Sequence, residues 1–223
     1  MPEELVEQIQ PILDFLKAAN FPIIKKPGYE ADDIIGTISK RAISHSLDTY
    51  IVSGDKDLMQ LVNKSTFLYT PGNRFKPTTI YNEEKVIAKW GVKPGKIIEF
   101  LALMGDTSDN IPGVEGVGQK TASKLLNEYE NIYEIIKNAE KIKNKRVSNG
   151  LIKSRDYFEI SLKLVTIDDE VPIEFEIEDF IRKNINGEDF LKLLQNYELY
   201  SLQKHIEDIF IDENINNNIS KVE

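Results

Sequence analysis

The sequence contains no cysteine and only two histidines, His45 and His205, among its 223 residues. The absence of cysteine excludes disulfides, thiolate-ligated zinc and cysteine nucleophiles, and two histidines are too few for a His-rich metal centre. No apolar run approaches the roughly 18 residues that a membrane-spanning helix requires. The first ten residues, MPEELVEQIQ, are too acidic and polar for a signal peptide. These absences predict a cytoplasmic protein.

The charge of the chain is unevenly distributed. The composition, with 41% hydrophobic and 29% charged residues and a net charge of −9, is that of a globular protein. Residues 116–165 carry 10 basic and 6 acidic side chains, whereas residues 166–223 carry 5 basic and 15 acidic ones. A local basic surface is what binds nucleic-acid phosphates, although such a run is more often only a solvated helical surface.

Hydrophobic spacing predicts an α/β region followed by a helical region. The expected strands lie at residues 21–25, 48–53 and 67–69. The expected helices lie at residues 3–19, 29–44, 58–62, 83–90, 94–104, 118–129, 131–139, 148–163 and 188–210. Residues 164–175 resemble one more extended stretch, and the Asn-rich residues 211–223 a polar tail or linker. Strands that alternate with helices are typical of a parallel sheet.

Seven carboxylates fall in three short clusters. The clusters are Glu30, Asp32 and Asp33, then Asp55 and Asp57, then Asp106 and Asp109. Each cluster alone is also what helix capping or an Asx-rich turn produces. Together, with no histidine or cysteine beside them, they favour hard cations such as Mg²⁺ or Mn²⁺, and two such ions are a standard device for phosphodiester hydrolysis. Lys56, between Asp55 and Asp57, is interpreted as a solvated surface lysine rather than an electrophile.

A glycine-rich turn follows the third acidic cluster. In IPGVEGVGQKTASKLL, Gly116, Val117 and Gly118 lie between two predicted helices, and Lys120 and Thr121 open the second. Free amides at a helix N-terminus bind phosphate, and a lysine there adds charge without reading bases. This pattern is that of a helix-hairpin-helix element, although a plain helix-helix turn with a glycine stop is the alternative. Basic residues downstream would extend the backbone contact: Lys137, Lys141, Lys143, Lys145, Arg146, Lys153 and Arg155.

The strings GYEADD, SGDKDLMQL and GDTSDNIPGVEGVGQKTA resemble the 5′-nuclease domain of bacterial DNA polymerase I, within the flap endonuclease family. The resemblance covers Met1 to about Phe210. It implies a Rossmann-like, PIN-type sheet in residues 1–81 and a helical domain with a helix-three-turn-helix in residues 82–210. It further implies a divalent-metal-dependent 5′-3′ exonuclease and flap endonuclease acting on DNA with 5′ flaps, nicks or ends. A polymerase domain in the same or another chain is then an expected partner, and the nucleoid an expected location.

The resemblance also assigns roles residue by residue. It implies that Glu30, Asp32, Asp33, Asp55 and Asp57 hold or surround a first metal ion, and that Asp106 and Asp109 hold a second. Asp33, Asp55 and Asp57 are then the expected catalytic residues. Backbone groups around Val114 and Val117 resemble a K⁺ site that helps clamp the duplex. The expected DNA contacts are Gly116, Val117, Gly118, Lys120 and Thr121.

One departure from the family pattern leaves alternatives open. In the family, a long segment normally precedes a string like MPEEL and supplies a first strand with a metal-binding aspartate and a basic helical arch, so the sheet is expected to be truncated. The chain is therefore expected to be an active nuclease, a non-catalytic fragment that binds branched DNA, or one part of a split nuclease. A PIN-like ribonuclease or an aspartyl phosphatase is a third interpretation, which the helix-hairpin-helix pattern disfavours.

Overall fold

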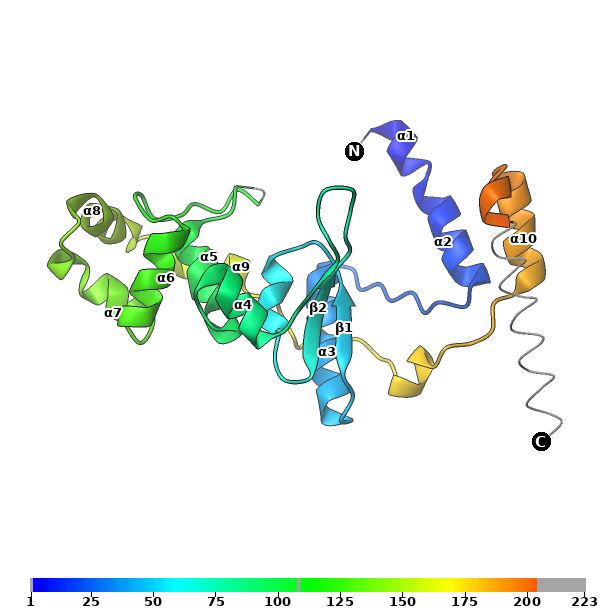
Figure 1. Cartoon of the computed structure of the whole chain (residues 1–223), viewed down its shortest axis with the longest axis horizontal. Coiled ribbons are helices and arrows are strands. Elements are labelled where there is room, and N and C mark those ends of the chain that lie inside the picture. The colour runs from blue at the N-terminus through cyan, green and yellow to red at the C-terminus, as the bar shows by residue number, and fades with distance from the viewer. Residues whose placement is uncertain (1, 108, 204–223) are drawn as a thin grey trace. The chain divides into compact units, whose positions relative to one another are not determined.

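A computed structural model of the chain describes residues 2–107 and 109–203 (Figure 1). The chain divides into two compact units. The larger unit comprises residues 26–173, and the smaller unit joins residues 1–25 to the segment that begins at residue 174. All the candidate site residues named above lie in the larger unit.

The larger unit contains a three-stranded sheet in the order β1-β2-β3, formed by Thr49–Val52, Thr66–Thr70 and Thr79–Tyr81. The expected parallel pairing is present between β1 and β2, with Ile51 opposite Leu68. The sheet as a whole is mixed, because β3 runs antiparallel to β2. Residues 71–78 are too few for the dozen or so that a parallel crossover needs, so the chain reverses in a hairpin. The sequence analysis missed β3, a three-residue strand directly after a proline-containing turn.

Helix α3 (Ala31–Ser44) packs against β1 and against residues 166–171. A capping box between Glu30 and Asp33 begins the helix. The backbone amide of Val171 donates to the Thr37 hydroxyl at 3.0 Å, and the Lys40 ammonium pairs with Asp169 at 2.8 Å. The segment after residue 165 has no strand partner in the described sheet, because its amides donate to side chains of α3 and, at Ile167, to Gln60 of η1 (Asp57–Leu61).

The helical region follows the sheet. Its α-helices are α4 (Glu83–Trp90), α5 (Ile97–Met104), α6 (Gln119–Glu128), α7 (Ile132–Lys137), α8 (Lys145–Ser154) and α9 (Phe158–Val165). Short 3₁₀ turns lie at η1 (Asp57–Leu61), η2 (Pro94–Lys96) and η3 (Ala139–Lys141). The prediction of a single helix at residues 148–163 is wrong. Residues 155–157 separate α8 from α9, and there the Tyr157 hydroxyl donates to the carbonyl of Gly113 at 3.3 Å.

One continuous apolar core joins the sheet to the helices. It extends from Ile51 and Leu68 in the strands to Leu151 in α8 and Val165 in α9. Helix α5 lies within this core, since Phe100–Leu103 are almost completely buried. The loop that follows α5 therefore begins at a helix fixed by the buried core.

The smaller unit pairs α2 (Ile9–Ala18) with α10 (Gly187–Asn196), and also contains α1 (Glu3–Val6) and η4 (Ile177–Phe180). The Phe15 ring lies 5.4 Å from that of Phe190, and the amide of Asn186 donates to the carbonyl of Ala18. The strand expected at residues 21–25 is absent, because this segment pairs with no described strand. The helix expected at residues 188–210 is interrupted at Glu198, whose φ of 53° is left-handed; residues 204–210 lie outside the described part.

The predicted domain boundary at residues 81/82 stays a prediction, and the tail at 211–223 lies outside the described residues. In the part of the chain that the structure describes, no helix combines the length and the apolar character needed to cross a bilayer.

Candidate metal centre and nucleic-acid interface

The loop after β1 positions Asp55 and Asp57. The Ser53 hydroxyl accepts a hydrogen bond from the amide of Asp55 at 3.0 Å, and Asp55 Oδ1 accepts one from the amide of Asp57 at 2.9 Å. This Asx turn starts η1. It turns the Asp57 side chain inward, where only 17% of it is exposed. A short polar segment after a buried strand thus places two carboxylates at the carboxyl end of β1.

The loop after α5 positions Asp106 and Asp109. It is closed by two backbone hydrogen bonds between Asp106 and Ile111, at 2.9 and 2.7 Å. Gly105 has a φ of 78°, and a Cβ on either Gly105 or Gly113 would overlap backbone atoms of the facing segment. The two glycines therefore let the chain cross itself closely. The closed loop buries the side chain of Asp106 and leaves Asp109 exposed.

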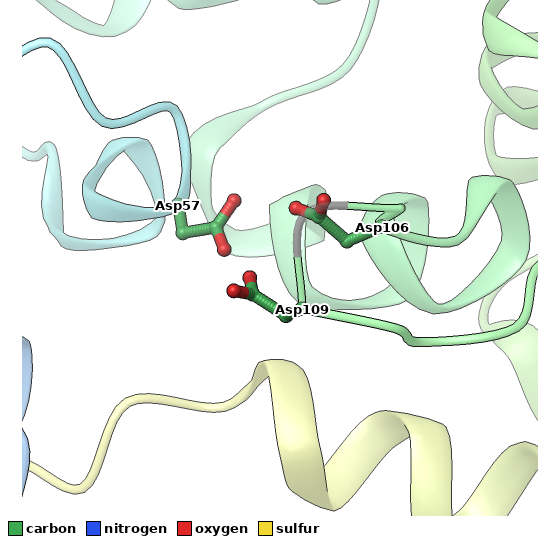
Figure 2. Close-up of side chains that lie close together, drawn as sticks. All are labelled: Asp57, Asp106 and Asp109. Atoms are coloured by element: carbon green, nitrogen blue, oxygen red, sulfur yellow. The ribbon is translucent and has the colours of Figure 1, made fainter. Parts of the chain in front are cut away.

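Asp57, Asp106 and Asp109 meet across these two loops and are called here the aspartate cluster (Figure 2). One carboxylate oxygen of each lies within 4.8 Å of the other two. The Oδ1 atom of Asp57 is buried and has no hydrogen-bond partner among the described residues. A buried carboxylate oxygen that lacks a hydrogen-bond partner and faces two further carboxylates is an arrangement that fits a divalent cation with oxygen ligands.

The first acidic cluster opens onto the same space. A pocket of about 980 Å³, called here the acidic pocket, is lined by six of the seven candidate carboxylates: Glu30, Asp32, Asp33, Asp55, Asp57 and Asp109. The seventh, Asp106, joins them through the aspartate cluster. Asp33 also has a structural role, since its carboxylate accepts from the amides of Glu30 at 3.1 Å and Asp168 at 2.9 Å. The fold thus brings all seven carboxylates together.

Two of the seven carboxylates, Asp57 and Asp32, have a raised pKa. Burial raises the pKa of Asp57 to about 6; the Lys56 charge opposes this rise, and the neighbouring charges of Asp55, Asp106 and Asp109 add to it. Burial also raises the pKa of Asp32, followed by the charges of Asp55, Glu30, Asp33 and Asp109. Asp109 affects both groups, which is why the carboxylates behave as one electrostatic unit. Like charges this close to one another disfavour ionisation, and a bound cation would offset that effect.

Lys56 lies inside this unit and is not the solvated lysine that was expected. Its ammonium donates to Asp106 Oδ2 and lies 3.5 Å from Asp57 Oδ1. Burial lowers the pKa of Lys56, but the hydrogen bond to Asp106 and the charges of Asp57, Asp106 and Asp55 outweigh it and leave the pKa raised. The interpretation failed because Asp106 is distant in sequence, so no local pattern revealed this partner.

The glycine-rich turn precedes α6 as expected. Gly116 has a φ of 83°, and a Cβ there would lie 2.9 Å from Cγ of Arg146, so glycine is needed on two counts. Gly118 is the N-cap of α6, and a Cβ there would meet nothing within 4 Å. The first turn of α6 carries no acidic residue, and Lys120 in it is exposed. This helix N-terminus is therefore open to an anion.

The residues within the turn divide between buried and exposed. Val114 and Val117 are buried, and the Val117 amide donates to the Val114 carbonyl at 3.0 Å. Glu115 between them is exposed and pairs with Arg146 at 3.8 Å and with Lys153 at 3.3 Å. Two of the basic residues expected to contact DNA are thus already held beside the turn.

The sequence analysis missed several residues that line these surfaces. Lys163 of α9 and Asp168 line the acidic pocket, and no motif marks either one. A second pocket, of about 540 Å³, is called here the basic pocket. It is lined by α6 and by the segment before α8, and its basic residues are Lys120, Lys124, Lys141 and Lys143. Lys124 lies one helical turn after Lys120, and this spacing was the signal that could have identified it.

Two family models match consecutive parts of the chain. Residues 1–91 match the model described as the N-terminal resolvase-like domain of the 5′-3′ exonuclease, and residues 92–188 match its C-terminal SAM fold. Among solved structures, the larger part of the fold is similar to the flap endonuclease of bacteriophage T5 in a complex with DNA and metal ions. That likeness has a TM-score of 0.65 at 21% identity, and it covers 86% of this chain and 68% of the T5 chain. It supports the α/β fold with a helical half.

Two curated relatives show how far the similarity extends. A DNA polymerase I of Caldicellulosiruptor bescii is 38% identical over 92% of this chain, which corresponds to only 24% of the polymerase. A 5′-3′ exonuclease of Aquifex aeolicus is 37% identical over 94% of this chain, which corresponds to 70% of that protein. The chain therefore spans about a quarter of the polymerase relative and most of the separate exonuclease. With both family models matched and an exonuclease relative covered over more than two thirds of its length, the chain belongs to the 5′-3′ exonuclease family.

Proposed function

We propose that the chain is a divalent-metal-dependent 5′-3′ exonuclease and flap endonuclease that hydrolyses DNA phosphodiesters in replication and repair. The observation that carries this proposal is the acidic pocket, in which carboxylates from three separate segments converge and Asp57 Oδ1 is buried without a hydrogen-bond partner. Family membership supports the same activity. The exonuclease relative and the T5 flap endonuclease point to DNA processing.

The seven carboxylates have different roles in this proposal. In this proposal Glu30, Asp32, Asp33, Asp55 and Asp57 hold or surround one Mg²⁺ or Mn²⁺ ion, and Asp106 and Asp109 hold a second. Asp33, Asp55 and Asp57 act closest to the reacting phosphate. When bound, the ions supply Lewis-acid activation of water and neutralise charge on the phosphate and the leaving oxygen. The closed loop at Asp106 and the Asx turn at Asp55 hold the ligands without further rearrangement.

The turn at Gly116–Gly118 and the start of α6 grip the DNA backbone. Gly118, Lys120 and Thr121 present an open helix N-terminus to a phosphate, and Gly116 and Val117 let the backbone approach it. The basic pocket supplies further positive charge. A K⁺ ion at the backbone of Val114 and Val117 would add to the clamp. The substrate is DNA with 5′ flaps, nicks or ends in the cytoplasm, and a polymerase domain is a partner suggested by the polymerase relatives.

A gel assay with a 5′-labelled flap duplex tests the activity. We expect purified chain to cleave in Mg²⁺ and in Mn²⁺ but not in EDTA, and the double variant Asp55→Asn/Asp57→Asn to lose cleavage. The matched control is Glu83→Gln/Glu84→Gln, which removes two exposed charges at the start of α4 and leaves the acidic pocket unchanged. Cleavage that survives in the aspartate variant refutes the assignment.

A second candidate function is DNA binding without cleavage. It is favoured by the open N-terminus of α6 and the turn before it, which can hold a phosphate independently of the acidic pocket. It predicts salt-dependent, sequence-tolerant binding of flap DNA with no product. Metal-dependent turnover by rigorously purified chain excludes it.

A further inference from the structure

The ammonium of Lys56 is placed among the carboxylates of the aspartate cluster. It donates to Asp106 Oδ2 and lies 3.5 Å from Asp57 Oδ1, the buried oxygen that has no hydrogen-bond partner among the described residues. The Lys56 side chain is 31% exposed and that of Asp106 only 4%, so solvent screens this pair weakly. The lysine is thus a built-in cation within the set of ligands that the proposed function gives to a metal.

An ammonium and a divalent ion compete for the same oxygens. One carboxylate oxygen of each of Asp57, Asp106 and Asp109 lies within 4.8 Å of the other two, and the Lys56 ammonium already contacts two of these three carboxylates. Two cations cannot share one carboxylate oxygen at contact distance without strong repulsion. A divalent ion among these carboxylates is therefore repelled by Lys56 as long as the ammonium stays on Asp106.

We infer that Lys56 is the resident counter-ion of the aspartate cluster, and that metal binding proceeds by exchange, with the divalent ion displacing the Lys56 ammonium from Asp106 and Asp57. The inference rests on the proposed metal-dependent function and adds a residue that sets metal affinity. Lys56 is a positioning residue in this account: it keeps the carboxylates together when metal is absent and lowers the apparent metal affinity when metal is present.

The displaced side chain has space to occupy. Lys56 lines an open pocket of about 520 Å³ together with Ser53, Asp55, Asp106 and Asp109. Its backbone lies at the N-cap of η1, with a φ of −75° and a ψ of −23°. Because the Lys56 side chain is 31% exposed, its flexible four-carbon stem can carry the ammonium away from Asp106 toward solvent.

Metal-binding affinity and metal-free stability test the inference together. The variants are Lys56→Gln, which removes the charge, and Lys56→Arg, which keeps it. The control is Lys64→Gln, which removes an exposed charge in the loop before β2. Affinity for Mn²⁺ is measured by calorimetry on metal-stripped protein, and thermal unfolding is followed in EDTA.

We expect Lys56→Gln to unfold at lower temperature in EDTA and yet to bind Mn²⁺ about tenfold more tightly, since a charged hydrogen bond no longer competes. Lys56→Arg should bind Mn²⁺ no more tightly than the wild type, because a guanidinium keeps the competing charge. Lys64→Gln should match the wild type in both measurements. A lysine that merely supports the structure would give weaker Mn²⁺ binding on removal, the opposite sign.

Two results overturn the inference in distinguishable ways. Equal or weaker Mn²⁺ binding by Lys56→Gln, with wild-type binding intact, refutes the exchange and leaves the proposed function standing. An absence of Mn²⁺ binding by the wild-type chain refutes the metal-dependent function and the inference with it. If Lys56→Gln does not fold in EDTA, Lys56→Arg decides: tighter Mn²⁺ binding by this variant contradicts competition by the resident charge.

Discussion

Replacing Asp57 by asparagine should stabilise the metal-free protein and abolish its response to Mg²⁺. Burial, opposed by the charge of Lys56 and reinforced by that of three aspartates, raises the pKa of Asp57 from 3.8 to about 6. Each unit of such a shift corresponds to about 1.4 kcal/mol, so the ionised carboxylate costs the folded state up to ~3 kcal/mol. Because Asp57 is only 17% exposed, solvent screening reduces this cost moderately, and we expect a gain of about 1–3 kcal/mol for Asp57→Asn at pH 8.

The direction of this pKa shift determines how the unfolding free energy changes with pH. The folded-state pKa of Asp57 lies above the unfolded-state value, so the folded state binds the proton more tightly. Wild-type stability therefore falls as pH rises from about 4 to about 6 and stays lowered above that range. The asparagine variant lacks this contribution. The difference in unfolding free energy between variant and wild type should be largest at pH 8 and shrink to roughly a third of that value at pH 4.5.

Urea unfolding in EDTA at the two pH values measures the difference, followed by the same titration in excess Mg²⁺. The wild type should gain about 2.7 kcal/mol at a Mg²⁺ concentration 100 times the dissociation constant, whereas Asp57→Asn should gain far less. Asp48→Asn, an exposed aspartate just before the other end of β1, is the matched control. A variant that is less stable than the wild type in EDTA at pH 8, or one that keeps the full Mg²⁺ response, refutes the electrostatic reasoning.

Two further predictions concern the loop after α5 and the basic pocket. Gly113→Ala should cost more than about 2 kcal/mol in urea unfolding, because its Cβ overlaps the facing backbone, whereas Gly95→Ala, with nothing within 4 Å, should change stability by less than about 0.5 kcal/mol. Equal costs would contradict the close crossing. The double variant Lys120→Ala/Lys124→Ala should weaken duplex DNA binding and lower the salt-dependence slope by about 1–2, measured by fluorescence anisotropy at several salt concentrations. The control Lys85→Ala, on α4, should not change the slope, and an unchanged slope in the double variant would place the DNA elsewhere.

Local sequence patterns predicted most of the helices and the strands β1 and β2. The strand β1 and the helices α4, α5 and α6 were expected from hydrophobic spacing. Each buries one face against a neighbour, so apolar residues recur along it with the period of a strand or a helix. The predictions failed where the outcome depended on distant partners. The segment at residues 21–25 is apolar but pairs with no described strand, and β3 is too short to show a period.

Family membership and the identity of the seven carboxylates were accessible from sequence alone, because the motifs are contiguous strings and carboxylates without histidine or cysteine imply hard cations. Only the tertiary structure brought six of them into one pocket and placed the seventh, Asp106, beside Asp57 and Asp109. Three segments far apart in the chain converge there, through the Asx turn at Asp55 and the crossing at Gly105 and Gly113. The pairing of Lys56 with Asp106 is likewise visible only in the tertiary structure, because the two residues are 50 positions apart and no sequence pattern links them. The sequence by itself determined which carboxylates are candidate ligands, and the fold decided which charges face one another and that burial raises the pKa of Asp32 and Asp57.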